Sequence, residues 1–175
     1  ERADAPGETV TTRGALQIPG APTPPVYVAA LGPQLLRLAG RRTAGTITWM
    51  TGPKALAEHI VPTLRAAAAE VGRPADAVRV VACLPVSVTD DVDAVRARAA
   101  DEFAVYGHLP SYRAMLDRDG AAGPADVAII GDEDTVAERI AALGGAGVDE
   151  FVGIAFDGSP EGRARTRALL RRLDP

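Results

Sequence analysis

Short apolar runs alternate with amphipathic stretches along the chain from residue 26 onward. Three of the runs, at residues 26–31, 46–50 and 151–156, contain β-branched or aromatic residues and are bounded by Gly or Pro, which is typical of β-strands. A fourth run, residues 78–88, is almost continuously apolar, as expected for a strand that is covered on both faces of a parallel sheet. Because a helical stretch follows each run, the pattern predicts a parallel α/β arrangement of four strand-then-helix units.

The helices are predicted from apolar residues at a spacing of three or four and from their start signals. Two helices open with Gly-Pro, at residues 32–33 and 52–53. Pro62 falls inside the second helix and should kink or divide it near Val61. The unit that follows residues 78–88 has more helix than one crossover needs, so we expect an enlarged helical insertion there. The predicted helices are 33–42, 53–71, one capped by Asp90 or Asp91 and closed at 107, 111–118, one capped by Asp132 or Asp134 and running to 143, and 160 onward.

Two positions leave the strand assignment open. Pro85 lies inside the apolar run at 78–88 and lacks a backbone N–H, so it implies a bulge or an edge there. Residues 126–131 could form a further strand, but they could equally be an extended lead-in or a helical turn before the next helix. We favour the lead-in or turn, which leaves four predicted parallel strands.

Residues 1–25 differ in composition from the rest of the chain. Eight of them are Pro or Gly, which excludes a long helix or a central strand. Within this loop, residues 10–12 and 15–18 flank Arg13-Gly14 and could pair as a short hairpin. The sequence therefore predicts two regions, a loop with a possible short hairpin at 1–25 and four βα units at 26–175.

Composition indicates one ordinary globular domain. A hydrophobic share of 47% with 24% charged residues is enough for a packed core. The net charge of −4 and the absence of a basic run give no reason to expect nucleic-acid binding. No apolar run reaches the roughly 18 residues that a membrane span needs, and the acidic, Pro-rich start does not resemble a signal peptide. We therefore expect a cytoplasmic protein without a membrane partner.

The residues that most often carry catalysis or bind metals are few. Cys83 is the single cysteine, so it cannot form an internal disulfide, and we interpret it as a small buried hydrophobic residue. His59 and His108 have no second His, Cys or carboxylate at metal-ligand spacing, so no metal site is expected. By motif alone the sequence does not reveal a reaction.

The two Gly-Pro turns are the candidates for ligand binding. In parallel α/β folds ligands lie beyond the carboxyl ends of the strands, which is where Gly32-Pro33 and Gly52-Pro53 fall. Free backbone N–H groups at the positive end of a helix suit a phosphate. The local pattern alone nevertheless favours ordinary turns, because many turns of this form bind nothing.

Two side chains near the second turn have alternative interpretations. Lys54 opposes the helix dipole unless an anion lies between them, but a solvated surface lysine explains it as well and is favoured. Trp49 could stack on a ligand ring or fill the core, and the core is favoured.

Four segments, in their order and spacing, resemble the luciferase-like monooxygenase superfamily, and in particular its branch of oxidoreductases that use the deazaflavin coenzyme F420. The resemblance extends over nearly the whole chain from about Thr9 onward. The segments are PVYVAALGP at 25–33, TITWMTGP at 46–53, HIVP at 59–62 and FAVYGHLPSYR at 103–113.

The resemblance implies that the chain is the C-terminal half of a (β/α)8 TIM barrel, with strands five to eight and an enlarged helical insertion. Four units are too few to close such a barrel. The implied cofactor is coenzyme F420, with FMN as the alternative, and its phosphate would lie near the first turn and the end of the next strand. The implied cofactor-binding residues are Ala30, Leu31, Gly32, Pro33, Thr48, Trp49, Met50, Thr51 and Lys54.

The implied activity is hydride transfer between the reduced deazaflavin and a small organic substrate. The family's catalytic residues lie largely on the earlier strands, so they have no counterpart here. Residues 43–45, Thr-Ala-Gly, depart from the family, which commonly has an acidic residue before this glycine. The implied partners are a missing N-terminal half or a second copy in a homo-oligomer. The alternative is a non-catalytic module that pairs through open sheet edges at Val26 or Phe151.

Overall fold

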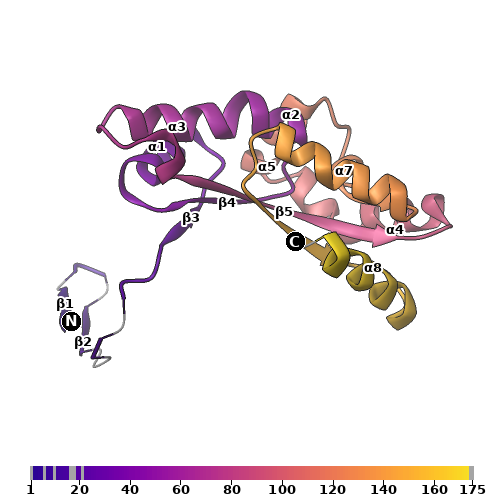
Figure 1. Ribbon diagram of the computed structural model, residues 1–175, viewed down its shortest axis with the longest axis horizontal. Coiled ribbons are helices and arrows are strands. Elements are labelled where there is room, and N and C mark those ends of the chain that lie inside the picture. Colours follow the sequence, from indigo (N-terminus) through magenta and orange to yellow (C-terminus); the bar gives the residue numbers. More distant parts are fainter. Residues whose placement is uncertain (1, 6, 10, 16–18, 21, 174–175) are drawn as a thin grey trace.

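A computed structural model describes residues 2–5, 7–9, 11–15, 19–20 and 22–173 (Figure 1). Its main element is a five-stranded parallel sheet centred on the long strand β5. β4 pairs with the first half of β5 and β7 lies on its other side, while β3 extends the sheet beyond β4. The predicted parallel α/β fold is therefore confirmed. The strands are β3 (Tyr27–Ala29), β4 (Gly45–Trp49), β5 (Arg79–Val88), β6 (Ile129–Gly131) and β7 (Glu150–Ala155).

Helices follow the strands as the sequence predicts. None of those in the described part of the chain is long and apolar enough to cross a membrane. The helices are α1 (Pro33–Arg42), α2 (Pro53–Ala55), α3 (Val61–Ala69), α4 (Val92–Glu102), α5 (Pro110–Asp119), α6 (Pro124–Val127), α7 (Glu133–Gly145) and α8 (Pro160–Leu173), with a π turn at Leu56–Ile60 and 3₁₀ turns at Ala75–Ala77 and Ala104–Gly107.

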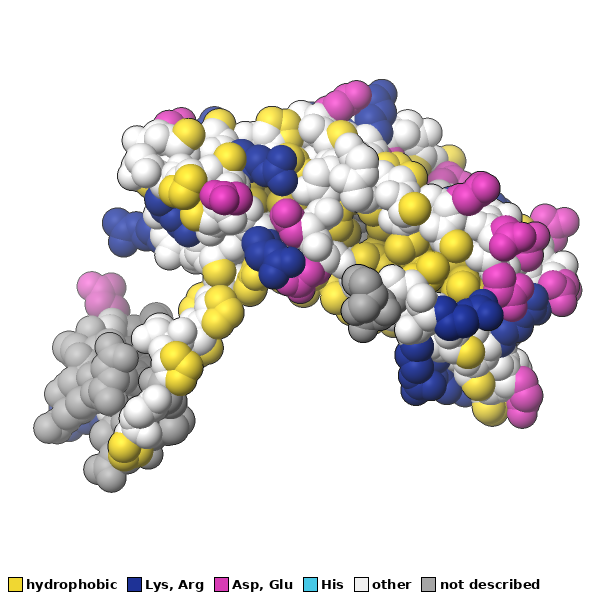
Figure 2. All heavy atoms as spheres, viewed as in Figure 1, with side chains coloured by type: hydrophobic (Ala, Val, Ile, Leu, Met, Phe, Trp, Pro, Cys, Tyr) yellow, Lys and Arg dark blue, Asp and Glu magenta, His cyan; other side chains and the backbone are white. Residues whose placement is uncertain are grey.

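The helices cover one face of the sheet and leave apolar side chains on the other. Val80 and Val86 of β5 have no exposed surface, and Gly153 of β7 lies so close to Leu170 of α8 that a Cβ would clash. Since side chains alternate along a strand, those on either side of Gly153 point to the opposite face, where Val152 and Ile154 are 40% and 44% exposed. Hydrophobic side chains accordingly gather over the middle of the molecule in Figure 2.

Residues 126–131 contain a short strand that the sequence analysis did not favour. α6 ends at Val127, and β6 then pairs in parallel with the last three residues of β5, Val86↔Ile129 to Val88↔Gly131. The expected helical turn is present, but the preference against a strand at 129–131 was wrong. The sheet has five parallel strands within the described residues rather than the predicted four.

Pro85 lies where its missing N–H faces no neighbouring strand. Backbone groups of the even residues of β5 point toward β7, since Val80 O accepts from Asp149 N, whereas those of the odd residues point the other way, since Arg79 N donates to Ala44 O. On that second side β4 has ended at Cys83 and β6 begins only at Val86. Pro85 thus occupies a local edge, as predicted.

Near the N-terminus, β1 (Arg2–Ala5) pairs antiparallel with β2 (Thr12–Ala15). This hairpin lies apart from the sheet, at the end of an extended segment (Figure 1). The predicted turn at Arg13-Gly14 was wrong, because both residues lie inside β2. Residues 10 and 16–18 of the predicted strands lie outside the described residues. The division of the chain at residue 25 stays a prediction.

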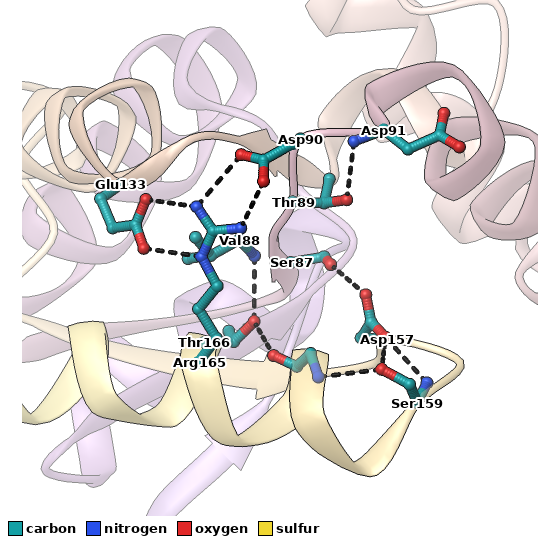
Figure 3. Close-up of polar contacts among 11 residues, drawn as sticks. Ser87, Val88, Thr89, Asp90, Asp91, Glu133, Asp157, Ser159, Arg165 and Thr166 are labelled. Carbon is teal, nitrogen blue, oxygen red and sulfur yellow. Dashed lines mark hydrogen bonds and ion pairs between the residues drawn. The ribbon is translucent and has the colours of Figure 1, made fainter.

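One ion cluster ties α8 to α7 and to the loop after β5 (Figure 3). The Arg165 guanidinium donates to both carboxylate oxygens of Glu133 at 2.7 Å and to those of Asp90 at 3.1 and 3.2 Å. At the next residue of α8, the buried Thr166 hydroxyl accepts from Val88 N at 2.9 Å. These contacts fix α8 against the end of β5.

Replacing Glu133 should change how stability depends on pH. The Arg165 guanidinium lowers the pKa of the Glu133 carboxyl from 4.5 to about 2. Because the folded pKa is depressed, the stabilisation is complete above about pH 4.5 and is lost as pH falls toward 2. We expect Glu133→Gln to lower the free energy of unfolding at pH 6, with the deficit shrinking as the pH approaches 2, in urea titrations across this range.

Glu138→Gln is the matched control, because Glu138 lies on the same helix, is exposed and has no hydrogen bond or ion pair with the residues described. A pH profile for Glu133→Gln that is parallel to wild type would contradict the assignment.

Candidate functional site

A cavity of about 590 Å³ opens at the carboxyl ends of β3 and β4. Residues of β7 and of α5, in the helical insertion, complete its wall. Apolar side chains dominate, with a few polar groups among them, which is the usual make-up of a small-molecule site. The lining residues are Ala29, Ala30, Leu31, Gly32, Leu35, Ile47, Thr48, Trp49, Cys83, Ser111, Tyr112 and Ile154.

The structure brings together five of the nine residues that the resemblance implied for cofactor binding. Ala30, Leu31, Gly32, Thr48 and Trp49 all line this cavity. The other four lie outside its lining: Pro33 and Lys54 are exposed at the surface, whereas Met50 and Thr51 are completely buried. Only the first Gly-Pro turn and the end of β4 therefore belong to the candidate site.

The two Gly-Pro turns differ in what satisfies their backbone N–H groups. At the second turn, the Asp119 carboxylate accepts from Gly52 N at 2.8 Å and from Ala55 N at 2.9 Å. Asp119 comes from the end of α5 and occupies the place that an anion would take. At the first turn, Gly32 is exposed, no side chain caps α1, and no acidic residue lies in its first turn. The first turn is the one open to a ligand.

His59 makes a hydrogen bond to the backbone of the first Gly-Pro turn. Its Nε2 lies 2.9 Å from the Leu31 carbonyl oxygen, and because a carbonyl only accepts, Nε2 carries the proton. His59 is buried in the π turn, which sits where Pro62 was predicted to divide the helix near Val61. That prediction is confirmed. Sequence reasoning gave His59 no role, because its partner is 28 residues away and not a metal.

Trp49 connects the cavity to the helical insertion. Its ring makes edge contacts with Phe103 and Tyr106 at centroid distances of 6.0 and 5.9 Å, and Tyr106 in turn contacts Tyr112 at 4.9 Å. Its Nε1 is buried and has no hydrogen-bond partner among the described residues. Both interpretations of Trp49 therefore hold in part, since the ring packs in an aromatic cluster and also lines the cavity.

Cys83 lies on the cavity wall next to Trp49, with which it pairs in register. It is half-buried rather than buried, so the interpretation of Cys83 as a buried residue was wrong. Partial burial raises the pKa of its thiol. The group is therefore an uncharged thiol at neutral pH, and it is poorly suited to act as a nucleophile.

Ser111 and Tyr112 reach the cavity from α5, and sequence reasoning did not place them in the site. The pKa of the Tyr112 hydroxyl is raised by burial and by the neighbouring Tyr106, so the hydroxyl stays protonated and can donate. The signal that could have found them was the Pro110 start of a helix inside the FAVYGHLPSYR segment. In the described part of the chain, no group of three His, Cys, Asp or Glu side chains is placed to hold a metal ion.

Comparison with known proteins identifies relatives of this fold. A family model described as luciferase-like monooxygenase matches residues 1–150. No curated protein matches the chain. Among solved structures, the coenzyme F420 dependent tetrahydromethanopterin reductase from Methanopyrus kandleri is 27% identical, with a TM-score of 0.64 over 86% of this chain and 49% of that one.

Two further solved structures share the fold. An F420-dependent secondary alcohol dehydrogenase, in complex with an F420-acetone adduct, is 17% identical, with a TM-score of 0.72 over 99% of this chain and 56% of that one. The oxygenating constituent of 3,6-diketocamphane monooxygenase from Pseudomonas putida, in complex with FMN, is 20% identical, with a TM-score of 0.66 over 97% and 56%. The chain thus spans about half the length of these barrel proteins, and the predicted half-barrel fold class is confirmed.

Removing the Asp119 carboxylate should destabilise the second turn. Asp119→Ala leaves the N–H groups of Gly52 and Ala55 without a partner, and loss of such a cap costs about 1 kcal/mol. We expect that loss in the free energy of unfolding by urea titration. The control is Asp117→Ala on the same helix, since Asp117 is exposed and its side chain makes only an i,i+4 surface pair with Arg113, worth about 0.3–0.5 kcal/mol. Equal losses in both variants would contradict the capping role.

Proposed function

The chain belongs to the luciferase-like monooxygenase family, and we propose that it is the cofactor-binding C-terminal part of an oxidoreductase that uses coenzyme F420. The reaction is hydride transfer between the reduced deazaflavin and a small organic substrate. The identity of 27% to an F420-dependent reductase supports F420, and FMN is the alternative because a solved structure that covers 97% of this chain is in complex with FMN.

The uncapped N-terminus of α1 at the cavity is the observation that carries this proposal. Its free N–H groups and positive end dipole suit the cofactor's phosphate, whereas Asp119 already fills the equivalent place on α2. Gly32 has nothing within 4 Å of the position of a Cβ, so the space above the turn is available to a ligand. The His59 hydrogen bond holds the Leu31 carbonyl and so keeps the turn in this shape.

The remaining cavity residues fit the ring portion of the cofactor. The face of Trp49 and the apolar wall around Ile47 and Leu35 exclude water from the ring. When bound, the cofactor supplies the hydride chemistry and the protein supplies position and electrostatics. The chain's own residues bind, orient and shield, and we assign no proton transfer to any of them.

The open face of the sheet supports the partial status of the site. Val152 and Ile154 leave about two fifths of their surface exposed, and Ile154 also lines the cavity. We propose that further strands of the same barrel cover this face, with a second copy of the chain as the alternative occupant. A non-catalytic module that pairs through such edges is the competing function. Reading the genomic DNA upstream of residue 1 separates these cases, because four in-frame βα units there would exclude the module.

Adding a methyl group at Gly32 should weaken cofactor binding without disturbing the fold. Gly32 has a β-region backbone and open space, so Gly32→Ala is tolerated, but the methyl enters the volume assigned to the phosphate. We expect the affinity for F420, measured by fluorescence titration, to fall by about tenfold or more, as for the loss of one charge-assisted hydrogen bond. Gly144→Ala, in an equally open position on α7, should leave the affinity unchanged.

Unchanged affinity in Gly32→Ala would place the phosphate elsewhere. If neither F420 nor FMN binds to the chain, or to the chain together with whatever segment its gene encodes before residue 1, the proposed function is wrong.

Cys83 offers a readout of cavity occupancy that does not depend on activity. As the single cysteine, it reacts alone with a thiol reagent, and its raised pKa means that the rate should keep rising above pH 9, where an ordinary thiol approaches saturation. We expect saturating F420 or FMN to slow this reaction several-fold at constant pH. A rate that neither cofactor alters would show that the ligand does not occupy the space beside Cys83.

A further inference from the structure

A second cavity, of about 510 Å³, lies between α4 and α7 beyond the ends of β5 and β6. It shares no lining residue with the cavity of the proposed cofactor site. Four of its lining side chains are charged, two acidic and two basic, and two threonines accompany them. The lining residues are Thr89, Asp90, Val92, Arg96, Ile130, Gly131, Asp132, Thr135 and Arg139.

Both carboxylates of this cavity are engaged within the fold. Asp90 accepts two hydrogen bonds from Arg165, which belongs to the ion cluster with Glu133 (Figure 3). Asp132 caps α7 by accepting from Thr135 N at 2.9 Å, and the hydrogen bonds with Thr135 lower the pKa of its carboxyl. Asp90 is thus paired with a cation, whereas Asp132 accepts from a neutral N–H and keeps its negative charge in the cavity lining.

The two arginines, by contrast, lack strong partners. Arg96 is 3.8 Å from one oxygen of Asp126, whose other oxygen already accepts from Ala122 N and Gly123 N. Arg139 is half-buried and has no hydrogen bond or ion pair within the described ranges. Its pKa is lowered by burial and by the nearby charge of Arg96, so the two cations repel each other.

A half-buried guanidinium without an acceptor costs free energy, and a second guanidinium beside it raises that cost. An anion between the two removes both penalties at once. A guanidinium group can donate two parallel hydrogen bonds to the oxygens of one phosphate, and the hydroxyl of Thr89 on the wall can donate a further bond. The N-terminus of α7 is not needed for this argument, because Asp132 caps it.

We propose that the cavity between α4 and α7 is a binding site for a phosphate-type oxyanion, held between Arg96 and Arg139. The ligand is a free phosphate ion or the phosphate group of a larger molecule. The site is independent of the proposed cofactor function.

The test is calorimetric titration of the protein with inorganic phosphate in chloride buffer at constant ionic strength. We expect saturable binding that weakens about tenfold or more in Arg139→Gln, because charge-assisted hydrogen bonds are lost. Arg167→Gln is the matched control, since it removes one positive charge from an exposed position on α8 and should not change the affinity. Arg96→Gln, at a largely exposed position, should weaken binding too and keeps the test open if Arg139→Gln fails to fold.

Absence of binding, or an equal loss in Arg139→Gln and Arg167→Gln, would overturn the proposal. Thermal denaturation adds a second criterion. Without phosphate, Arg139→Gln should unfold at a temperature no lower than that of wild type. With phosphate, it should unfold at a lower temperature than wild type. A lower unfolding temperature in both conditions would show that Arg139 has only a structural role and would contradict the proposed site.

A final comparison distinguishes the two sources of the phosphate. Tighter binding of glycerol 3-phosphate than of inorganic phosphate identifies the group of a larger molecule, whereas equal or weaker binding identifies the free ion. Either result, together with the loss in Arg139→Gln, supports the site.

Discussion

The pairing capacity of β5 is the constraint on which the rest of the structure depends. It is the only strand of the described sheet long enough to pair with three others, and it does so by dividing its length among β4, β6 and β7. Its helix-facing side chains are fully buried, so neither its register nor its position can shift without exposing core. Both cavities lie along this strand, one at Cys83 and one beyond Val88, because it sets where the neighbouring strands end.

The second organising constraint is the need to satisfy the N–H groups at helix starts. Side chains solve it for four of the described helices: carboxylates cap α2 (Asp119), α4 (Asp91) and α7 (Asp132), and the Ser159 hydroxyl caps α8. The start of α1 has no such carboxylate, although its Gly-Pro sequence matches that of α2. The two Gly-Pro turns therefore differ in whether they can bind an anion, although their dipeptide is the same. The difference is due to Asp119, which lies 67 positions after Gly52.

This explains how far the sequence could predict the molecule. Four strands of the parallel sheet, all but β6, were predictable because each lies in an apolar run bounded by turn residues, and Pro62 interrupts its helix because a missing N–H acts locally. The preference against β6 failed because β6 follows α6 almost directly, so the same apolar residues fit a helical turn as well as a strand, and only the pairing with β5 decides. The burial of Met50 and Thr51 and the role of His59 were likewise hidden, because they follow from contacts between distant segments.

Two arginines near the loop after β5 differ in their partners. Arg165 is held in an ion cluster, whereas Arg139 has no hydrogen bond or ion pair within the described residues. Asp90 takes both its oxygens to Arg165, and Glu133 takes both of its own to the same guanidinium, so two acids serve one base. Arg139 lines the cavity together with Arg96, which has only the Asp126 carboxylate at 3.8 Å. The charges of the lining add to zero, so composition alone favours neither an anion nor a cation. What favours an anion is that these two guanidinium groups lack close acceptors, whereas the Asp90 and Asp132 carboxylates already accept hydrogen bonds.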